Sequence, residues 1–131
     1  MAINNRGLFG QPTLPYVDGR VYAGDDVFVD LTFLDHAKVG VTPSSFTYEL
    51  DDITNNVNMI PSTVVSSGIS SSKYTLQLDS DLMVMTYTWS GSQLCQLWVT
   101  ADYTDSVTGN PAQSNGVWII ELCAIQVPST Q

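Results

Sequence analysis

Two stretches near the end of the chain decide the fold: Leu94–Tyr103 (LCQLWVTADY) and Val117–Val127 (VWIIELCAIQV). Each alternates in steps of two residues and is rich in β-branched and aromatic side chains, a pattern typical of β-strands. The residues between them, Thr104–Gly116, are rich in Gly, Asn, Asp and Pro, which form turns. The sequence therefore predicts a large β-hairpin with a long loop.

Both faces of this hairpin carry apolar side chains. The first strand places on one face Cys95, Leu97, Val99, Ala101 and Tyr103. The second sets Val117, Ile119, Glu121, Cys123 and Ile125 against Trp118, Ile120, Leu122 and Ala124. Trp98 and Trp118 lie opposite Cys95 and Val117 on their strands, so the second face is expected either to be buried against a partner or to expose a tryptophan patch. A two-sided core with tryptophan at its margin is the alternative.

Other alternating runs precede the hairpin, with turn residues between them. The expected strands are Val27–Leu34, Ser45–Asp52, Val57–Val65, Lys73–Leu78 and Leu82–Trp89. Pro61 predicts that Val57–Val65 is an edge strand or is split in two, and Leu82–Met85 is equally compatible with a helical turn. About seven strands without a long amphipathic helix predict an all-β protein, a single antiparallel β-sandwich of the immunoglobulin-like or jelly-roll kind.

The first residues differ in character from the rest. Residues 1–22 are rich in Gly and Pro and show no sustained periodicity, so they are expected to form an extended N-terminal arm, with disorder as the alternative. The β-sandwich domain is then expected to span residues 23–131. The apolar side chains that would anchor the arm on a partner are Ile3, Leu8, Phe9, Leu14 and Tyr16.

Composition narrows the function. At 131 residues and 44% hydrophobic content the chain can form one domain with a core, but only 13% of it is charged, against about 25% in an average domain. This balance suits a protein that covers its surface with partners. Four basic residues and a net charge of −9 argue against nucleic-acid binding. No stretch approaches the ~20 apolar residues of a membrane helix, and no signal peptide is recognisable at the N-terminus, so synthesis in a cytoplasm is expected.

Candidate catalytic and thiol groups are few. His36, the single histidine, is either a general base or, as we expect, an exposed turn residue. Cys95 and Cys123 could face each other across the hairpin, but in a protein made in the cytoplasm we expect both to be reduced and buried. Two cysteines do not complete a zinc site. We predict that the protein is not an enzyme and has no cofactor.

Acidic pairs and tryptophans leave two further readings open. Calcium could bind the pairs Asp25-Asp26, Asp51-Asp52 and Asp79-Ser80-Asp81, but aspartates at strand ends more often satisfy turn backbone. Trp89, Trp98 and Trp118 could form the aromatic platform of a carbohydrate-binding module.

Two segments carry a resemblance to a known family. Gly24–Asp35 (GDDVFVDLTFLD) and Pro43–Asp52 (PSSFTYELDD) resemble the opening strands of small virion proteins of tailed phages, about a fifth of the chain. That family includes capsid decoration (cement), neck, tail and baseplate proteins and has no catalytic residues to carry over. The resemblance implies a structural subunit of a virion with a β-sandwich fold.

These observations together lead to one expectation of function. We expect a capsid decoration protein that binds and stabilises the major capsid shell, with a neck, tail or baseplate component as the alternative and a carbohydrate-binding module as the alternative from another class. Its partners would be the major capsid protein or other virion subunits and further copies of itself, as a dimer or trimer. The protein would be made in the host cytoplasm and reside on the capsid surface. Trp98 and Trp118 would join the arm in binding partners.

Overall fold

The computed structural model describes residues 20–87 and 91–124, and the chain in these ranges is all β-structure with turns and no helix. The strands are β1 (Arg20–Tyr22), β2 (Val27–Thr32), β3 (Ser45–Asp52), β4 (Val57–Val65), β5 (Lys73–Leu78), β6 (Ser92–Thr104) and β7 (Pro111–Cys123). The predicted all-β class is confirmed. The expected bounds of β3, β4 and β5 are also confirmed.

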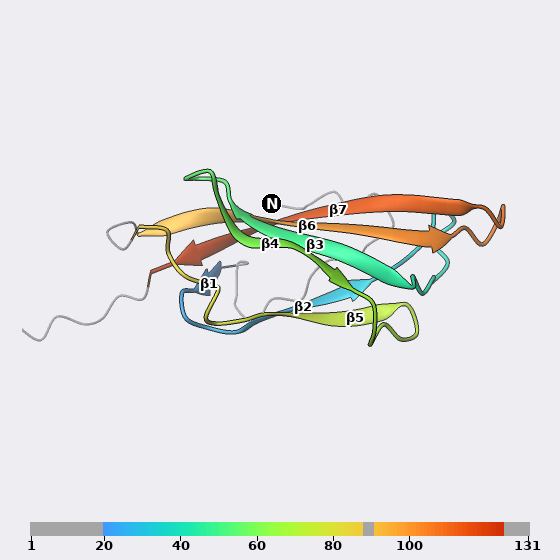
Figure 1. Cartoon of the computed structure of the whole chain (residues 1–131), viewed down its shortest axis with the longest axis horizontal. Helices are drawn as coiled ribbons and strands as arrows, with labels where there is room; N and C mark the ends of the chain where they lie inside the picture. The colour runs from blue at the N-terminus through green and yellow to red at the C-terminus, as the bar shows by residue number, and fades with distance from the viewer. Residues whose placement is uncertain (1–19, 88–90, 125–131) are drawn as a thin grey trace, which may run out of the picture.

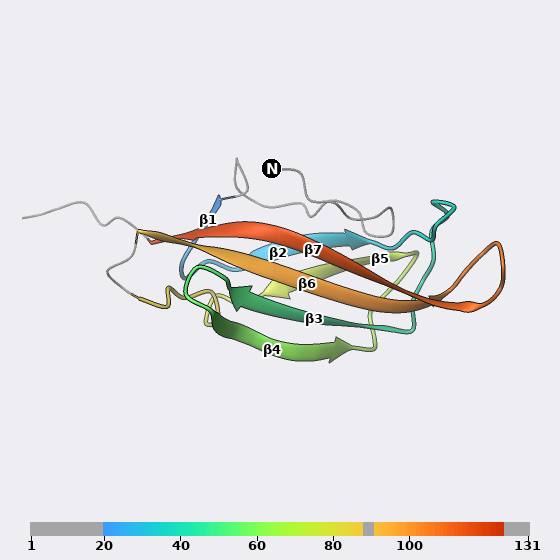
Figure 2. The ribbon, with the colours of Figure 1, turned by 90° about the horizontal axis from the view of Figure 1, so that it is seen from above.

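The strands form two layers that face each other across one core (Figures 1 and 2). The larger layer is a five-stranded sheet in the order β1-β7-β6-β3-β4, and the smaller pairs β2 with β5. Neighbours are antiparallel except β1 and β7, which run parallel from Arg20↔Glu121 to Tyr22↔Cys123. The expectation of purely antiparallel pairing is therefore wrong, because the chain forms this short strand against β7 before it crosses to β2 in the other layer.

The predicted hairpin is confirmed for the described residues and is longer than expected. Strands β6 and β7 pair over their full 13 residues, from Ser92↔Cys123 to Thr104↔Pro111. The loop is only residues 105–110, so the prediction that it extends to Gly116 is wrong. Pro111 is tolerated as the first residue of a strand. Asn115 pairs with Thr100 in the ladder, and its side chain accepts a 2.7 Å hydrogen bond from the Thr100 hydroxyl.

The core lies between the layers and is filled by alternate residues of each strand. In β2 the inward side chains are Val27, Val29 and Leu31, as the alternation predicts. The other buried apolar residues include Phe33, Phe46, Leu50, Leu76, Leu78, Leu97, Val99, Trp118, Ile120 and Leu122. Phe33 and Phe46 meet with ring centroids 5.5 Å apart, a favourable distance for aromatic packing.

Strand β4 forms one edge of the larger sheet, as Pro61 predicts. It is not split: it pairs with β3 on both sides of the proline, with register shifts between Tyr48 and Leu50 and between Leu50 and Asp51. Extra residues in β4 at these shifts accommodate the missing donor of Pro61, because a bulge leaves one residue unpaired.

The segment after β5 is a turn rather than a strand. The amides of Leu82 and Met83 donate to the carbonyl of Asp79, a single helical turn, and Met83 is fully buried. The carbonyl of Met83 in turn accepts from the amide of Gly24. For the described residues 82–87 the strand prediction is wrong, and the alternative of a helical turn at its start is correct.

The expected boundary between arm and domain falls inside the fold. Val21, which the sequence placed in the arm, is completely buried in the core, and Arg20–Tyr22 pair with β7. The last residues of the expected arm therefore belong to the sheet, because they bury an apolar side chain and complete the ladder of β7. Residues 1–19 lie outside the described residues.

The two faces of β6 should differ sharply in their contribution to stability. Leu97 is fully buried, whereas Leu94 on the same strand is 44% exposed. We expect Leu97→Ala to lower the free energy of unfolding by about 2–5 kcal/mol because it leaves a cavity. Leu94→Ala should change it by less than about 0.5 kcal/mol. Urea unfolding followed by circular dichroism measures both, and equal losses would contradict the assignment of the core face.

Candidate functional site

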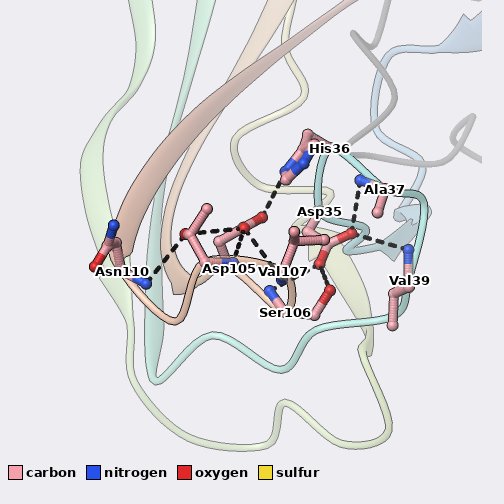
Figure 3. Close-up of polar contacts among 9 residues, drawn as sticks. Asp35, His36, Ala37, Val39, Asp105, Ser106, Val107 and Asn110 are labelled. Carbon is pink, nitrogen blue, oxygen red and sulfur yellow. Dashed lines mark hydrogen bonds and ion pairs between the residues drawn. The ribbon is translucent and has the colours of Figure 1, made fainter.

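Two loops meet at one end of the molecule and form a cluster of polar groups (Figure 3). The loop after β2 contributes Asp35 and His36, and the loop between β6 and β7 contributes Asp105 and Ser106. Both aspartates are buried, which requires that their charges be met by hydrogen bonds.

Asp35 connects the two loops. Its Oδ1 accepts from the amides of Ala37 at 2.9 Å and Val39 at 3.0 Å, which shapes its own turn. Its Oδ2 accepts from the amide of Ser106 at 3.0 Å and from the Ser106 hydroxyl. Together these hydrogen bonds lower the pKa of Asp35 from 3.8 to about 2, and the bond from the Ser106 hydroxyl makes the largest contribution. The same turn holds Lys38 at a φ of 64°, a backbone conformation uncommon outside glycine.

Asp105 organises the second loop and reaches His36. Its Oδ2 accepts from the amide and the hydroxyl of Thr108 at 2.9 and 3.0 Å, and its Oδ1 lies 2.6 Å from His36 Nδ1. The backbone bond from Thr108, followed by the contacts with the Thr108 hydroxyl and His36, lowers the pKa of Asp105. The expected exposure of His36 is confirmed, since 61% of its side chain is accessible.

The geometry of this cluster favours a structural role. A nucleophile must lie within hydrogen-bond reach of its base, yet the Ser106 hydroxyl is bonded to Asp35 and His36 to Asp105. The serine and the histidine are therefore held by different carboxylates. The cluster closes one end of the fold by tying two loops 71 residues apart in sequence.

The outer face of the five-stranded sheet presents a different kind of site, centred on Trp98. This residue is 44% exposed and pairs across the strands with Glu49 on β3 and with Val117 on β7. Leu94 on the same strand is also exposed, while Val117 and Ile119 are half-buried. The part of the hairpin that faces away from the core therefore carries an apolar cluster around Trp98, beside polar residues such as Gln96, Thr100 and Glu121.

Two hollows flank Trp98. One of about 190 Å³ is lined by Thr47, Tyr48, Glu49, Ser62, Trp98 and Thr100. The other, of about 440 Å³, is lined by Asp51, Asp52, Ile53, Asn56, Val57, Asn58, Gln96 and Trp98. Each hollow therefore combines the indole with carboxylate and with amide or hydroxyl groups.

The carboxylates on this face interact with each other. Glu49 and Asp51 are two residues apart on β3, so both point away from the core. A side-chain hydrogen bond with Asp51, burial and the like charge of that carboxylate raise the pKa of Glu49. Asp51 also accepts a 2.8 Å hydrogen bond from Asn58 on β4.

The expectation that Trp98 and Trp118 share a face is wrong. Trp118 pairs with Leu97, which faces inward, and is only 1% exposed. Since the second strand is apolar on both faces, the alternation did not reveal which face meets the core. Trp118 fills the core and is not available to a partner in this structure. Trp89 lies outside the described residues.

The cysteines also lie on opposite faces. Both are free, and in the ladder Cys95 is opposite Ile120 whereas Cys123 is opposite Ser92. The prediction of reduced thiols is confirmed in this structure. Burial of Cys95 is confirmed too, and it raises the pKa of that thiol to about 12. Cys123 is half-buried on the outer face, so the prediction of its burial is wrong, although partial burial raises its pKa as well.

Aspartates of the acidic pairs that could bind calcium accept hydrogen bonds from backbone amides in turns. Asp26 accepts from the amide of Ser80, and Asp79 from the amide of Asp81. Asp52 accepts from the backbone and side chain of Asn55 and from the hydroxyl of Thr86. Within residues 20–87 and 91–124, no group of three or more acidic, histidine or cysteine side chains is placed to hold a metal ion.

The remaining predicted site residues are those of the arm. Ile3, Leu8, Phe9, Leu14 and Tyr16 lie outside the described residues, so their binding role stays a prediction. Within the part of the chain that is described, no helix is long and apolar enough to cross a membrane. Comparisons with protein-family models, curated proteins and solved structures found no match.

Sequence reasoning missed Asp35, Asp105 and Glu49. The first two pair with groups far away in the chain, which no local pattern reveals. A signal for Glu49 was present: Glu49 and Asp51 stand two residues apart in a predicted strand, which places two like charges on one face.

Asp35→Asn should weaken the cluster and change how stability depends on pH. The lowered pKa means that the ionised form stabilises the fold above its unfolded pKa of 3.8, and that this contribution is lost as the pH falls toward about 2. We therefore expect a lower urea midpoint for Asp35→Asn at neutral pH and a smaller further loss on acidification. Asp81→Asn, at an exposed turn position, is the control. A variant whose midpoint falls as steeply with acid as the original chain would contradict this role of Asp35.

Proposed function

We propose that this chain is a structural subunit of a tailed-phage virion, and specifically a decoration protein on the outside of the major capsid shell. The observation that carries the proposal is the outer face of the five-stranded sheet, where Leu94 and Trp98 are exposed beside the half-buried Val117 and Ile119. An apolar patch of this kind marks an interaction surface. The low charged content of 13% also suits a chain with much of its surface against partners.

The charge of the chain supports the outside of the shell as its location. At −9 the domain would be repelled by packaged DNA, whereas an external position avoids that contact. The resemblance of Gly24–Asp35 and Pro43–Asp52 to small virion proteins agrees with this assignment. A neck, tail or baseplate component is the alternative within the same class.

We further propose that the topology is immunoglobulin-like rather than a jelly roll. In immunoglobulin domains strands C, F and G share one sheet, while B and E lie in the other, and variable-type domains add C′. If β2 and β5 are taken as strands B and E, and β3, β4, β6 and β7 as C, C′, F and G, the strands of this chain are divided between the two sheets in the same way. The disulfide between strands B and F of antibody domains has no counterpart, since Cys95 on β6 is free and Val29 is buried on β2.

A carbohydrate-binding module is the second candidate. The observation in its favour is the exposed indole of Trp98 between two hollows lined by hydroxyl and amide groups. With Trp118 in the core, however, Trp98 is the one tryptophan of the described chain that offers a platform for a sugar ring.

The N-terminal arm is proposed to fasten the protein to a neighbouring virion subunit. Its apolar residues would each contribute about 2 kcal/mol if fully buried, before the cost of association is subtracted. Proline restricts the unbound arm, so less entropy is lost on binding.

Deletion of residues 1–19 tests this role while keeping β1 intact. We expect the shortened protein to retain its β-type circular dichroism spectrum and to lose co-sedimentation with expanded phage heads, because the anchors of the arm are gone. The full chain with Asp81→Asn is the control for binding. Full occupancy of heads by the shortened protein would show that the arm is not the fastener.

A closed homo-oligomer, a dimer or trimer, remains part of the proposal. We place such a contact on β7, where Val117 and Ile119 are half-buried. Val117 pairs with Trp98, but β7 lies one strand further than Trp98 from Glu49 and Asp51, which would repel their counterparts if two copies met at Trp98.

Light scattering on the full chain should therefore give two or three times the mass of one chain. Ile119→Lys should shift the protein toward the monomer, because a charge would be buried in the contact, whereas Asp81→Asn should not. A monomer at every accessible concentration would contradict the proposed assembly.

A further inference from the structure

The surface around Trp98 combines an exposed aromatic ring with carboxylates. In the ladder Trp98 stands between Val117 and Glu49, and directly opposed side chains have Cβ atoms about 5 Å apart. Asp51 lies one step further along the outward face of β3 and lines the second hollow beside the indole. A group placed on Trp98 can therefore contact both acidic side chains.

The hollow next to Glu49 is small. Its volume of about 190 Å³ is below the about 300–1,000 Å³ of pockets that enclose a drug-sized ligand. Its polar walls come from Thr47, Ser62 and Thr100. This hollow suits one long side chain of a partner better than a complete small molecule, whereas the second hollow, beside Asp51, is larger, at about 440 Å³.

Among the described residues, no ion pair is seen between a lysine or arginine and Glu49 or Asp51. The lysine and arginine residues of residues 20–87 and 91–124 are Arg20, Lys38 and Lys73. Arg20 is bound to Glu121 at 3.2 Å, Lys38 lies in the turn after β2, and Lys73 begins β5 in the other layer. The like charge of Asp51 helps to raise the pKa of Glu49, so a positive group at this place would relieve a repulsion that the fold maintains.

We propose that this face binds an arginine side chain presented by a different protein. A guanidinium stacks on an indole and at the same time donates paired hydrogen bonds to a carboxylate. Trp98 supplies the ring, and Glu49 and Asp51 supply the acceptors. A second copy of this chain is a poor source of the arginine, because it brings a net charge of −9 and the same acidic pair.

A neutral sugar fits the surface less well. It would stack on Trp98 and bond to the amide and hydroxyl groups, but it would leave the repulsion between Glu49 and Asp51 unrelieved. The inference concerns the chemistry of this one surface and does not depend on the virion role, so either can fail without the other.

The test is a nuclear magnetic resonance titration of the full chain with a short glycine-flanked arginine peptide. The matched control peptide carries citrulline, which has the shape of arginine without its charge. We expect saturable shifts of the Trp98 indole signal, identified by its loss in Trp98→Phe, with affinity for citrulline at least about threefold weaker. Glu49→Gln should weaken arginine binding to a similar extent, and Asp81→Asn should leave it unchanged.

Each other outcome overturns the proposal. These outcomes are equal binding of the citrulline peptide, no saturable shift at Trp98, and full binding to Glu49→Gln. A titration with maltohexaose or cellohexaose that shifts the Trp98 signal where arginine does not would assign the surface to a glycan. Shifts of the same signal with protein concentration alone, and none with peptide, would assign it to self-association.

Discussion

The ladder between β6 and β7 is the constraint on which the rest of the structure depends. Because side chains alternate along a strand, this long register sets the inward face of both strands at once. Trp118 and Leu97 therefore point into the core. Strands β3 and β1 can then join the sheet only with Phe46 and Val21 also pointing into the core. A slip by one residue would exchange the core face for the outer face along the whole hairpin.

The buried carboxylates of this chain are stabilised mainly by hydrogen bonds. With 13 acidic and 4 basic residues, most carboxylates have no cation available. The buried ones accept hydrogen bonds mainly from backbone amides and hydroxyls. These are Asp35 and Asp105 at one end of the layers, and Asp52 where the turn after β3 meets the segment before β6. Asp105 also contacts His36, and Asp52 the side chain of Asn55. Hydrogen bonds to the charged form keep these groups ionised. Acidic side chains thereby hold loops in place, a task often given to ion pairs.

Much of the fold can be predicted from the local alternation of apolar and polar residues. The parts that cannot be predicted have identifiable physical reasons. Strands such as Ser45–Asp52 carry one apolar face, so period and burial agree. Val117–Cys123 is apolar on both faces, which concealed the inward position of Trp118. The parallel pairing of Val21 with Leu122 and the bond between Asp35 and Ser106 join distant parts of the chain, and no short pattern encodes them. On the outer face, the sequence indicates Trp98 as a binding residue, but the position of Glu49 and Asp51 beside it depends on the register between β3 and β6.

The proline in β4 has a consequence for how the molecule behaves when it is concentrated. An open sheet edge offers amides and carbonyls to any extended chain and can start aggregation. Pro61 has no N–H to donate, and the two register shifts beside it disturb the regular spacing that another strand would need. At high concentration, two copies of the protein are therefore hindered from pairing their backbones at this edge. Contacts between copies at this edge are made by side chains, which makes them selective and reversible.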